Sequence, residues 1–300
     1  MKNAYRERWK KKDIIFLITA LTLPIIQFIL FYIIVNANSI ALAFQKTTDG
    51  THFTFNGLKN FSTVFDQIFH DESMQIMLGN TFKLYFASQI VMLFISLFLA
   101  YAFWKKVFAY KFFSAILFLP SIISNVVFVM IFRHLFTYLL PNLLNDQSIV
   151  ESLNAYTQGF ELTTLFYCFL SSGSMLLLLM GAMGGVDQSV VEYGRLDGCN
   201  VWQEFAHIVF PHIWPTLISL FMIGIASLFS NQGLLVTFYG ETTEPMVKTI
   251  GSHIYITVWS ENGSLQYPEL SALGLFLSTV IIVSSLLIKR LLEKIGPKEE

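Results

Sequence analysis

The chain has 300 residues, of which 54% are hydrophobic and 13% charged, and its formal net charge is −1. Soluble domains carry about 25% charged residues, so this composition excludes an ordinary soluble protein and indicates an integral membrane protein. Neither end carries the long charged tail that would suggest nucleic-acid binding. Cys168 and Cys199 are the only cysteines, so a disulfide framework is not expected.

Six uncharged apolar runs are long enough, or nearly so, to cross a hydrocarbon core, which needs about 20 helical residues. In chain order they are Ile14–Val35, Tyr85–Phe103, Phe112–Phe132, Leu162–Val186, Ile213–Phe229 and Leu270–Ile288. The sequence therefore predicts an all-α integral membrane fold with six transmembrane helices.

The first apolar run could be mistaken for a signal peptide, because basic residues precede it and Ala41-Leu42-Ala43 follows it. Its length exceeds the apolar core of a cleaved signal, which is about 7–15 residues. We therefore expect an uncleaved membrane anchor.

Lysine and arginine are concentrated on one side of the predicted spans, and basic loops stay in the cytoplasm. The basic side carries the amino terminus, the loop with Lys105, Lys106 and Lys111, Arg195 and the carboxyl terminus. Both termini are therefore predicted to be cytoplasmic, and the larger loops, Asn36–Leu84, Leu135–Glu161 and Ser230–Glu269, to face outward. The resulting segments are a basic amino terminus (1–13), a first transmembrane helix (14–35), an extracytoplasmic loop (36–73), a main transmembrane domain (74–288) and a cytoplasmic tail (289–300).

The loop between the fourth and fifth spans, Val190–Pro211, is unusually polar for this chain. Ser189 and Glu192 have the spacing of a capping box, which predicts a helix start. Gly198 can take the left-handed conformation that ends a helix, and Asn200 with Gln203 forms a second possible box. We therefore expect a helix, a tight turn and a second helix that carries Phe205 and Ile208, with Pro211 and Pro215 bending the entry to the fifth span.

This loop resembles the "EAA" loop of permease subunits in binding-protein-dependent ABC importers, E-A-A-x-x-D-G-A, five residues, then F-x-x-I-x-L-P. The residues in register are Glu192, Asp197, Gly198, Phe205, Ile208 and Pro211. The sequence departs from the pattern at Tyr193, Gly194, Cys199 and Phe210. The stretch Phe55–Phe61 is also similar to the F-x-G-L-x-N-F/Y motif of sugar-importing members, although an ordinary glycine-containing turn is an equally good interpretation.

The resemblance implies a type I ABC importer transmembrane domain over about residues 74–288, with residues 187–211 as the ATPase-coupling loop. It implies a bacterial cell membrane protein of the maltose-type, multiple-sugar branch that moves a carbohydrate, with an oligosaccharide favoured. The implied partners are a homologous second permease, two ATPase subunits that hold ATP and magnesium, an extracytoplasmic solute-binding protein and membrane lipid.

Several chemistries lack support in the sequence. There is no G-x-x-x-x-G-K-[ST] phosphate loop, so a partner must hydrolyse ATP, and there is no H-E-x-x-H metal motif. The run Ser171-Ser172-Gly173-Ser174 has no base beside it, so close helix packing or a pore lining is favoured over catalysis. We therefore expect no enzymatic activity, no cofactor or metal site in this chain and no nucleic-acid partner.

A secondary carrier or channel for a small polar solute remains the main alternative, together with an ABC permease for a non-sugar solute. Ion-coupled carriers usually place Asp, Glu, Lys or His within their spans, and the six predicted spans have none of these residues. For solute contact, the candidates are uncharged polar or aromatic residues in or beside spans that could bind sugar hydroxyls or stack on a sugar face: Ser121, Ser124, Asn125, Asn231, Gln232 and Tyr255.

Overall fold

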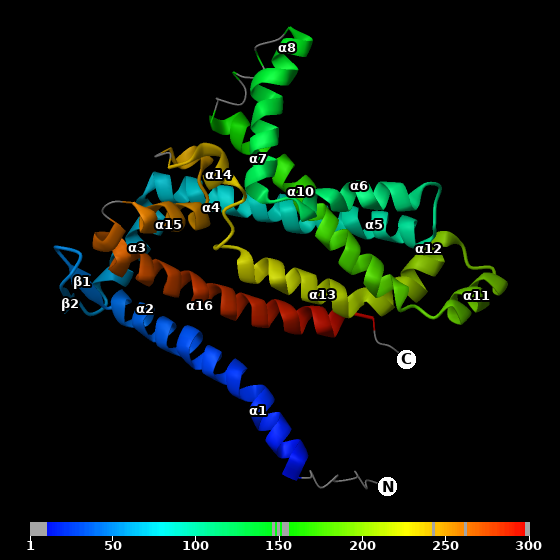
Figure 1. The fold of residues 1–300 in the computed structure, drawn as a ribbon, viewed down its shortest axis with the longest axis horizontal. Coiled ribbons are helices and arrows are strands. Elements are labelled where there is room, and N and C mark those ends of the chain that lie inside the picture. The colour runs from blue at the N-terminus through cyan, green and yellow to red at the C-terminus, as the bar shows by residue number, and fades with distance from the viewer. Residues whose placement is uncertain are drawn as a thin grey trace. The chain divides into compact units, whose positions relative to one another are not determined.

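We analysed a computed structural model, which describes residues 11–145, 148, 151, 156–241, 244–260 and 263–297. The basic cluster predicted before residue 11 lies outside these residues. Within the described chain, six helices are long and apolar enough to cross a membrane: Phe16–Ala43, Glu72–Trp104, Asn125–Leu144, Gln158–Gly184, Val201–Ser227 and Gly263–Ile295 (Figure 1). The all-α membrane fold predicted from the apolar runs is confirmed.

The chain separates into two compact units, Met1–Phe65 with Asn262–Phe276 and Asp66–Glu261 with Leu277–Glu300. The first unit contains α1 (Lys11–Gln27), a π-helical segment (Phe28–Ile34) and α2 (Val35–Ala43), which form one continuous helix. After this helix comes an antiparallel hairpin of β1 (Gln45–Thr47) and β2 (Phe53–Phe55), in which Gln45 pairs with Phe55.

The stretch Phe55–Phe61 returns to the end of this first helix and contacts it through Asn60. Gly57 has φ +62°, a left-handed value that glycine adopts without steric cost. The Asn60 side-chain amide donates hydrogen bonds to the carbonyls of Ala43 at 2.8 Å and Gln45 at 2.6 Å. The motif therefore has a structural role in this unit, because Asn60 satisfies the Ala43 carbonyl that the helix end leaves unpaired and joins it to the first strand.

The second unit is built on three long helices. The second span joins α4 (Glu72–Tyr85), a π-helical segment (Phe86–Val91) and α5 (Met92–Trp104). The fourth span is α10 (Tyr156–Gly184), and the fifth joins α12 (Val201–Glu204), a π-helical segment (Phe205–Val209) and α13 (Phe210–Ser227). Their shared core is apolar, and its most buried members include Leu97, Leu176, Leu179, Met183 and Ile213.

The third predicted span, Phe112–Phe132, is wrong as a single helix. It is divided between α6 (Tyr110–Ile122) and α7 (Asn125–His134), which are separated by extended backbone at Ile123 and Ser124. Serine and asparagine favour helix starts over helix interiors, and their pairing here explains the break. The helical chain then continues through a π-helical segment (Leu135–Leu139) and α8 (Leu140–Leu144), where the apolar-run analysis expected a loop.

Glycine allows α6 and α10 to pack closely. A Cβ atom on Gly173 would collide with the Leu117 carbonyl oxygen of α6. Ser172, beside it, is buried and donates its hydroxyl to the Phe169 carbonyl at 2.7 Å. The serine-rich run thus contributes to helix packing, the role favoured for small residues between membrane helices.

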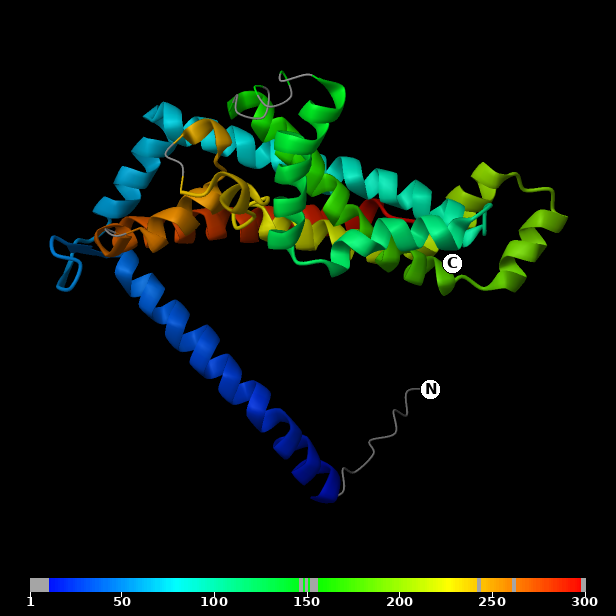
Figure 2. The same ribbon diagram turned by 45° about the horizontal axis from the view of Figure 1, so that its top comes forward.

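The two sides of the second unit differ in structure. In both views α14 (Leu235–Tyr239) and α15 (Ile250–Trp259) lie at one end of α5, α10 and α13, and α11 (Gln188–Leu196) with α12 lies at the other (Figures 1 and 2). Asn80 of α4 donates to the carbonyls of Met246 at 2.8 Å and Lys248 at 3.1 Å, beside a short 3-10 turn (Pro245–Val247). Within the predicted outer loop Ser230–Glu269, the described residues 244–248 are therefore anchored on α4. The remaining long helix, α16 (Gly263–Ile295), contributes residues to both units.

Candidate functional site

The polar loop forms the expected helical hairpin, but its first helix begins differently from the prediction. Asp187 caps α11, and its carboxylate accepts a hydrogen bond from the Ser189 backbone N–H at 2.9 Å. This bond holds the pKa of Asp187 below its usual value. The predicted box of Ser189 and Glu192 is wrong because Ser189 already lies inside the helix, and Glu192 is left exposed.

The tight turn after α11 is a Schellman motif centred on Gly198. The Gly198 N–H donates to the Arg195 carbonyl at 3.1 Å, and the Cys199 N–H donates to the Gly194 carbonyl at 2.9 Å. Gly198 has φ +84°, so the prediction that a left-handed glycine ends the helix is confirmed. The geometry reverses the chain within a few residues and places α12 beside α11.

The second helix starts with the predicted capping box. The Asn200 side chain accepts from the Gln203 N–H and the Gln203 side chain accepts from the Asn200 N–H, both at 2.9 Å. The helix then continues without interruption to Ser227. A π-helical segment (Phe205–Val209) ends two residues before Pro211, whose ring lacks the N–H that a regular turn would use.

The six motif residues divide into two groups by burial. Glu192, Asp197 and Gly198 are exposed, whereas Phe205, Ile208 and Pro211 are half-buried. The Phe205 ring lies 4.9 Å, centroid to centroid, from the Tyr101 ring of α5. The first group can therefore meet another molecule, while the second group packs the hairpin onto the helices.

Gly194, one of the departures from the motif, fits the Ile208 side chain. A Cβ atom on Gly194 would come within 2.8 Å of Ile208 Cδ1 and 3.8 Å of Cys199 Sγ. The missing methyl group lets α11 lie close to the second helix. The substitution thus tightens this contact, whereas sequence comparison with the motif suggests only a change of composition.

The hairpin presents large apolar side chains that the motif analysis did not select. Tyr193 is 69% exposed, Leu196 83% and Trp202 69%, and Val190 and Val201 are also exposed. We call these five side chains, with Glu192, the hairpin face. Their helical spacing, with Tyr193 and Leu196 three residues apart, is the signal that could have identified them.

A buried ionic cluster lies between the hairpin and the end of α5, and sequence reasoning missed it. Glu204 is 3% exposed, and its carboxylate accepts from Lys105 Nζ at 2.6 and 2.8 Å and from Arg195 Nε at 3.4 Å. The Tyr101 hydroxyl donates to Glu204 at 3.3 Å and to the Val201 carbonyl at 3.0 Å. The one feature of the sequence that points to this cluster is the position of Glu204, an acidic residue shortly before the fifth apolar run.

The candidate solute residues lie at two helix breaks and on one short helix. Ser124 and Asn125 are exposed at the break between α6 and α7, and Ser121 donates its hydroxyl to the Phe118 carbonyl in the same region. Asn231 follows α13, and its side-chain amide donates to the Tyr167 hydroxyl of α10 at 3.0 Å. Gln232 is half-buried beside it, and Tyr255 of α15 is 42% exposed. Five of the six candidates therefore lie at or beside one of the two helix breaks.

Comparison with known proteins gives the same interpretation as the hairpin. A family described as "binding-protein-dependent transport system inner membrane component" matches residues 92–298. This chain belongs to that family. Its match covers α5 to α16 and includes the whole hairpin.

This chain is similar to known permease proteins over most of its length. It is 23% identical over 277 residues to the multiple sugar-binding transport system permease protein MsmF of Streptococcus mutans, covering 90% of this chain and 93% of the relative. It is 25% identical over 276 residues to the arabinooligosaccharides transport system permease protein AraP of Bacillus subtilis, covering 88% and 84%. The fold is similar to a chain of a bacterial ABC transporter involved in import of the acidic polysaccharide alginate, with a TM-score of 0.75, 22% identity and coverage of 95% and 99%.

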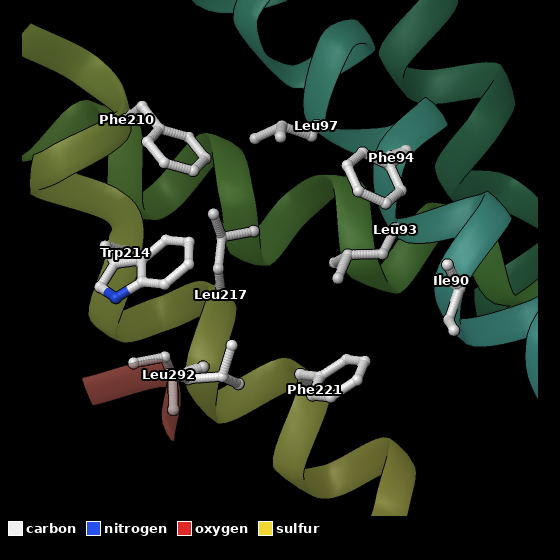
Figure 3. Close-up of a pocket in the computed structure, with 10 residues that line it drawn as sticks. Ile90, Leu93, Phe94, Leu97, Phe210, Trp214, Leu217, Phe221 and Leu292 are labelled. Carbon is white, nitrogen blue, oxygen red and sulfur yellow. The ribbon is translucent and has the colours of Figure 1, made fainter. Parts of the chain in front are cut away.

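The membrane component also contains an apolar crevice of about 200 Å³ between the second and fifth spans (Figure 3). Leu93, Phe94 and Leu97 of α5 line one side, and Phe210, Trp214 and Leu217 of α13 line the other. Its lining contains none of the six candidate solute residues. A crevice with an almost wholly apolar lining suits hydrocarbon better than a sugar, so it is not the predicted solute site.

Proposed function

We propose that this chain is a permease subunit of an ATP-driven importer for a carbohydrate, and that it forms half of the translocation pathway. The family match supports a membrane component of a binding-protein-dependent system, and the names of MsmF and AraP support a sugar or oligosaccharide substrate. In this proposal a second permease, two ATPase subunits and an extracytoplasmic binding protein complete the transporter.

The hairpin face carries the proposal, because it can dock in a groove of a soluble ATPase. Recognition of an amphipathic helix in a groove uses apolar anchors at helical spacing, and Tyr193 and Leu196 supply them. Glu192 makes no hydrogen bond or ion pair with any described residue, so its carboxylate is available to a basic group or N–H donor of the partner. The chain has no phosphate loop of its own.

Two substitutions separate docking from helix capping. Glu192→Gln keeps the shape of the side chain and removes its charge, whereas Asp187→Ala removes the cap of α11. Loss of a cap costs about 0.5–2 kcal/mol of local stability, while loss of one partner in a buried charged contact costs about 2–5 kcal/mol. A loss of about 2–5 kcal/mol in the charged contact weakens binding of the ATPase by more than about tenfold.

We expect Glu192→Gln to reduce co-purification of the ATPase more strongly than Asp187→Ala. Co-expression with the ATPase from the same source and quantification of the retained subunit measures both variants. Equally small losses would show that the carboxylate does not contact the ATPase.

ATP-dependent uptake of labelled oligosaccharides into vesicles tests the transport assignment itself, and uptake that is driven by an ion gradient without the ATPase would favour a secondary carrier.

The proposal includes the orientation, with the hairpin and both termini in the cytoplasm. The hairpin and the α14–α15 segment lie at opposite ends of the long helices (Figure 1), which supports their exposure on opposite sides of the membrane. A cysteine at Ser189 should react with a membrane-impermeant maleimide only after the cells are opened. A cysteine at Thr54 in β2 should react in intact cells. Labelling of position 189 in intact cells would reverse the topology.

A further inference from the structure

The buried carboxylate of Glu204 joins three elements that are distant in the sequence. Lys105 follows the last residue of α5, Arg195 lies in the last turn of α11, and Glu204 ends α12. Lys105 donates to both carboxylate oxygens, and Arg195 donates to one of them. A single side chain therefore connects both helices of the hairpin to the end of the second span.

Neighbouring contacts make this connection more specific than a surface ion pair. Tyr101, one turn before Lys105, donates its hydroxyl to the Val201 carbonyl in the first turn of α12. The Phe98 ring of α5 lies 6.0 Å from the Phe205 ring. A buried carboxylate that loses its cation is left uncompensated, so the arrangement strongly favours one position of the hairpin relative to α5.

The chain itself links the hairpin only to its two flanking spans. Residues 185–187 connect it to α10, and α12 continues directly into α13. The second span has no direct covalent connection to the hairpin, because 99 positions separate Lys105 from Glu204 along the chain. Any displacement of the hairpin can reach α5 directly only through noncovalent contacts.

We propose that Glu204 is a positioning residue that makes the hairpin and the adjoining end of α5 move as one body. This inference rests on the proposed function, in which an ATPase displaces the hairpin. The ion pair passes that displacement to the second span, together with the fourth and fifth. Its loss uncouples ATP hydrolysis from solute movement without removing the hairpin face that docks the ATPase.

The first test measures sugar imported per ATP hydrolysed by the complete transporter in vesicles. We expect Glu204→Gln and Lys105→Met to lower this ratio at least about threefold, while the amount of co-purified ATPase stays near that of wild type. Lys105→Arg keeps the charge and should retain most of the ratio. Lys106→Met is the matched control, because Lys106 is the next residue, is exposed and carries the same charge. Unchanged ratios for Glu204→Gln and Lys105→Met would overturn the proposal, even if the thermal midpoint fell.

A second measurement decides the question if those variants fold poorly. Cysteines replace Phe98 and Phe205 in a chain whose Cys168 and Cys199 are alanine, and a short bifunctional maleimide links them. The linked and unlinked forms of the same variant are then compared. If the hairpin and α5 move together, linked transporters import sugar at a rate within about twofold of the unlinked form. Arrest of transport on linking would show relative movement and overturn the proposal. Absence of ATP-driven import by the wild-type transporter would instead overturn the proposed function on which it rests.

Discussion

Replacement of Gly198 by valine tests whether the Schellman turn sets the position of the hairpin face. A Cβ atom at this position would meet nothing within 4 Å, so there is room for a side chain to begin there. The penalty comes from the backbone, because φ is +84° and a left-handed conformation costs an L-residue about 1–2 kcal/mol. The cost is greater for a β-branched side chain, for which this conformation is an outlier.

A change of φ at residue 198 relieves this strain. That change breaks the two turn hydrogen bonds donated by Gly198 and Cys199, and it reorients α11 relative to α12. We therefore expect Gly198→Val to insert in the membrane normally and to lose sugar uptake and ATPase binding together. Gly198→Asn is the control, because asparagine tolerates the left-handed region, and it should keep most of both activities.

Quantitative co-purification of the ATPase and uptake into vesicles provide the assay, with membrane yield as the measure of insertion. Normal uptake by Gly198→Val would show that the left-handed turn is unnecessary, and would refute the role of the Schellman turn in placing the hairpin face. Equal, severe losses in the valine and asparagine variants would show that residue 198 acts through its lack of a side chain in the docked complex.

Two further predictions concern the other close approaches made by glycine. Gly194→Ala should weaken the packing of α11 on the second helix by about 1–3 kcal/mol through contact with Ile208, which reduced ATPase co-purification would detect. Ile208→Val should restore part of the loss, and no restoration would show that the methyl group acts elsewhere. Gly173→Ala should lower the thermal midpoint in detergent, because the Leu117 backbone cannot move away cheaply. Gly181→Ala, in the same helix with open space around it, should leave the midpoint unchanged or higher, and equal effects of the two alanines would contradict the packing explanation.

The features that could be predicted from the sequence depend on short-range signals. Gly198 and the box of Asn200 with Gln203 are set by hydrogen bonds within a few residues, so local patterns are sufficient to find them. The start of α11 was predicted wrongly because Asp187 and Ser189 are both good caps, and their order along the chain does not decide between them.

Other features depend on contacts between distant residues. The partners Lys105 and Glu204 are 99 positions apart, and nothing in either neighbourhood indicates the pairing. The break at Ser124 lies inside an apolar run, so a count of apolar residues continues through it. Uncharged runs also gave helices that are too short, because a helix continues through charged residues at a membrane boundary, where water or protein partners solvate them.

The helix α13, from Phe210 to Ser227, has a consequence for the size of the transport movement. Its 18 residues span about 27 Å at 1.5 Å per residue. A tilt of about 10° at the Phe210 end therefore moves the Ser227 end sideways by about 5 Å. Asn231 lies just beyond that end, with its side chain against Tyr167 of the fourth span. A small rotation beside the hairpin thus becomes, at Asn231, a displacement larger than the length of a hydrogen bond, which is about 3 Å.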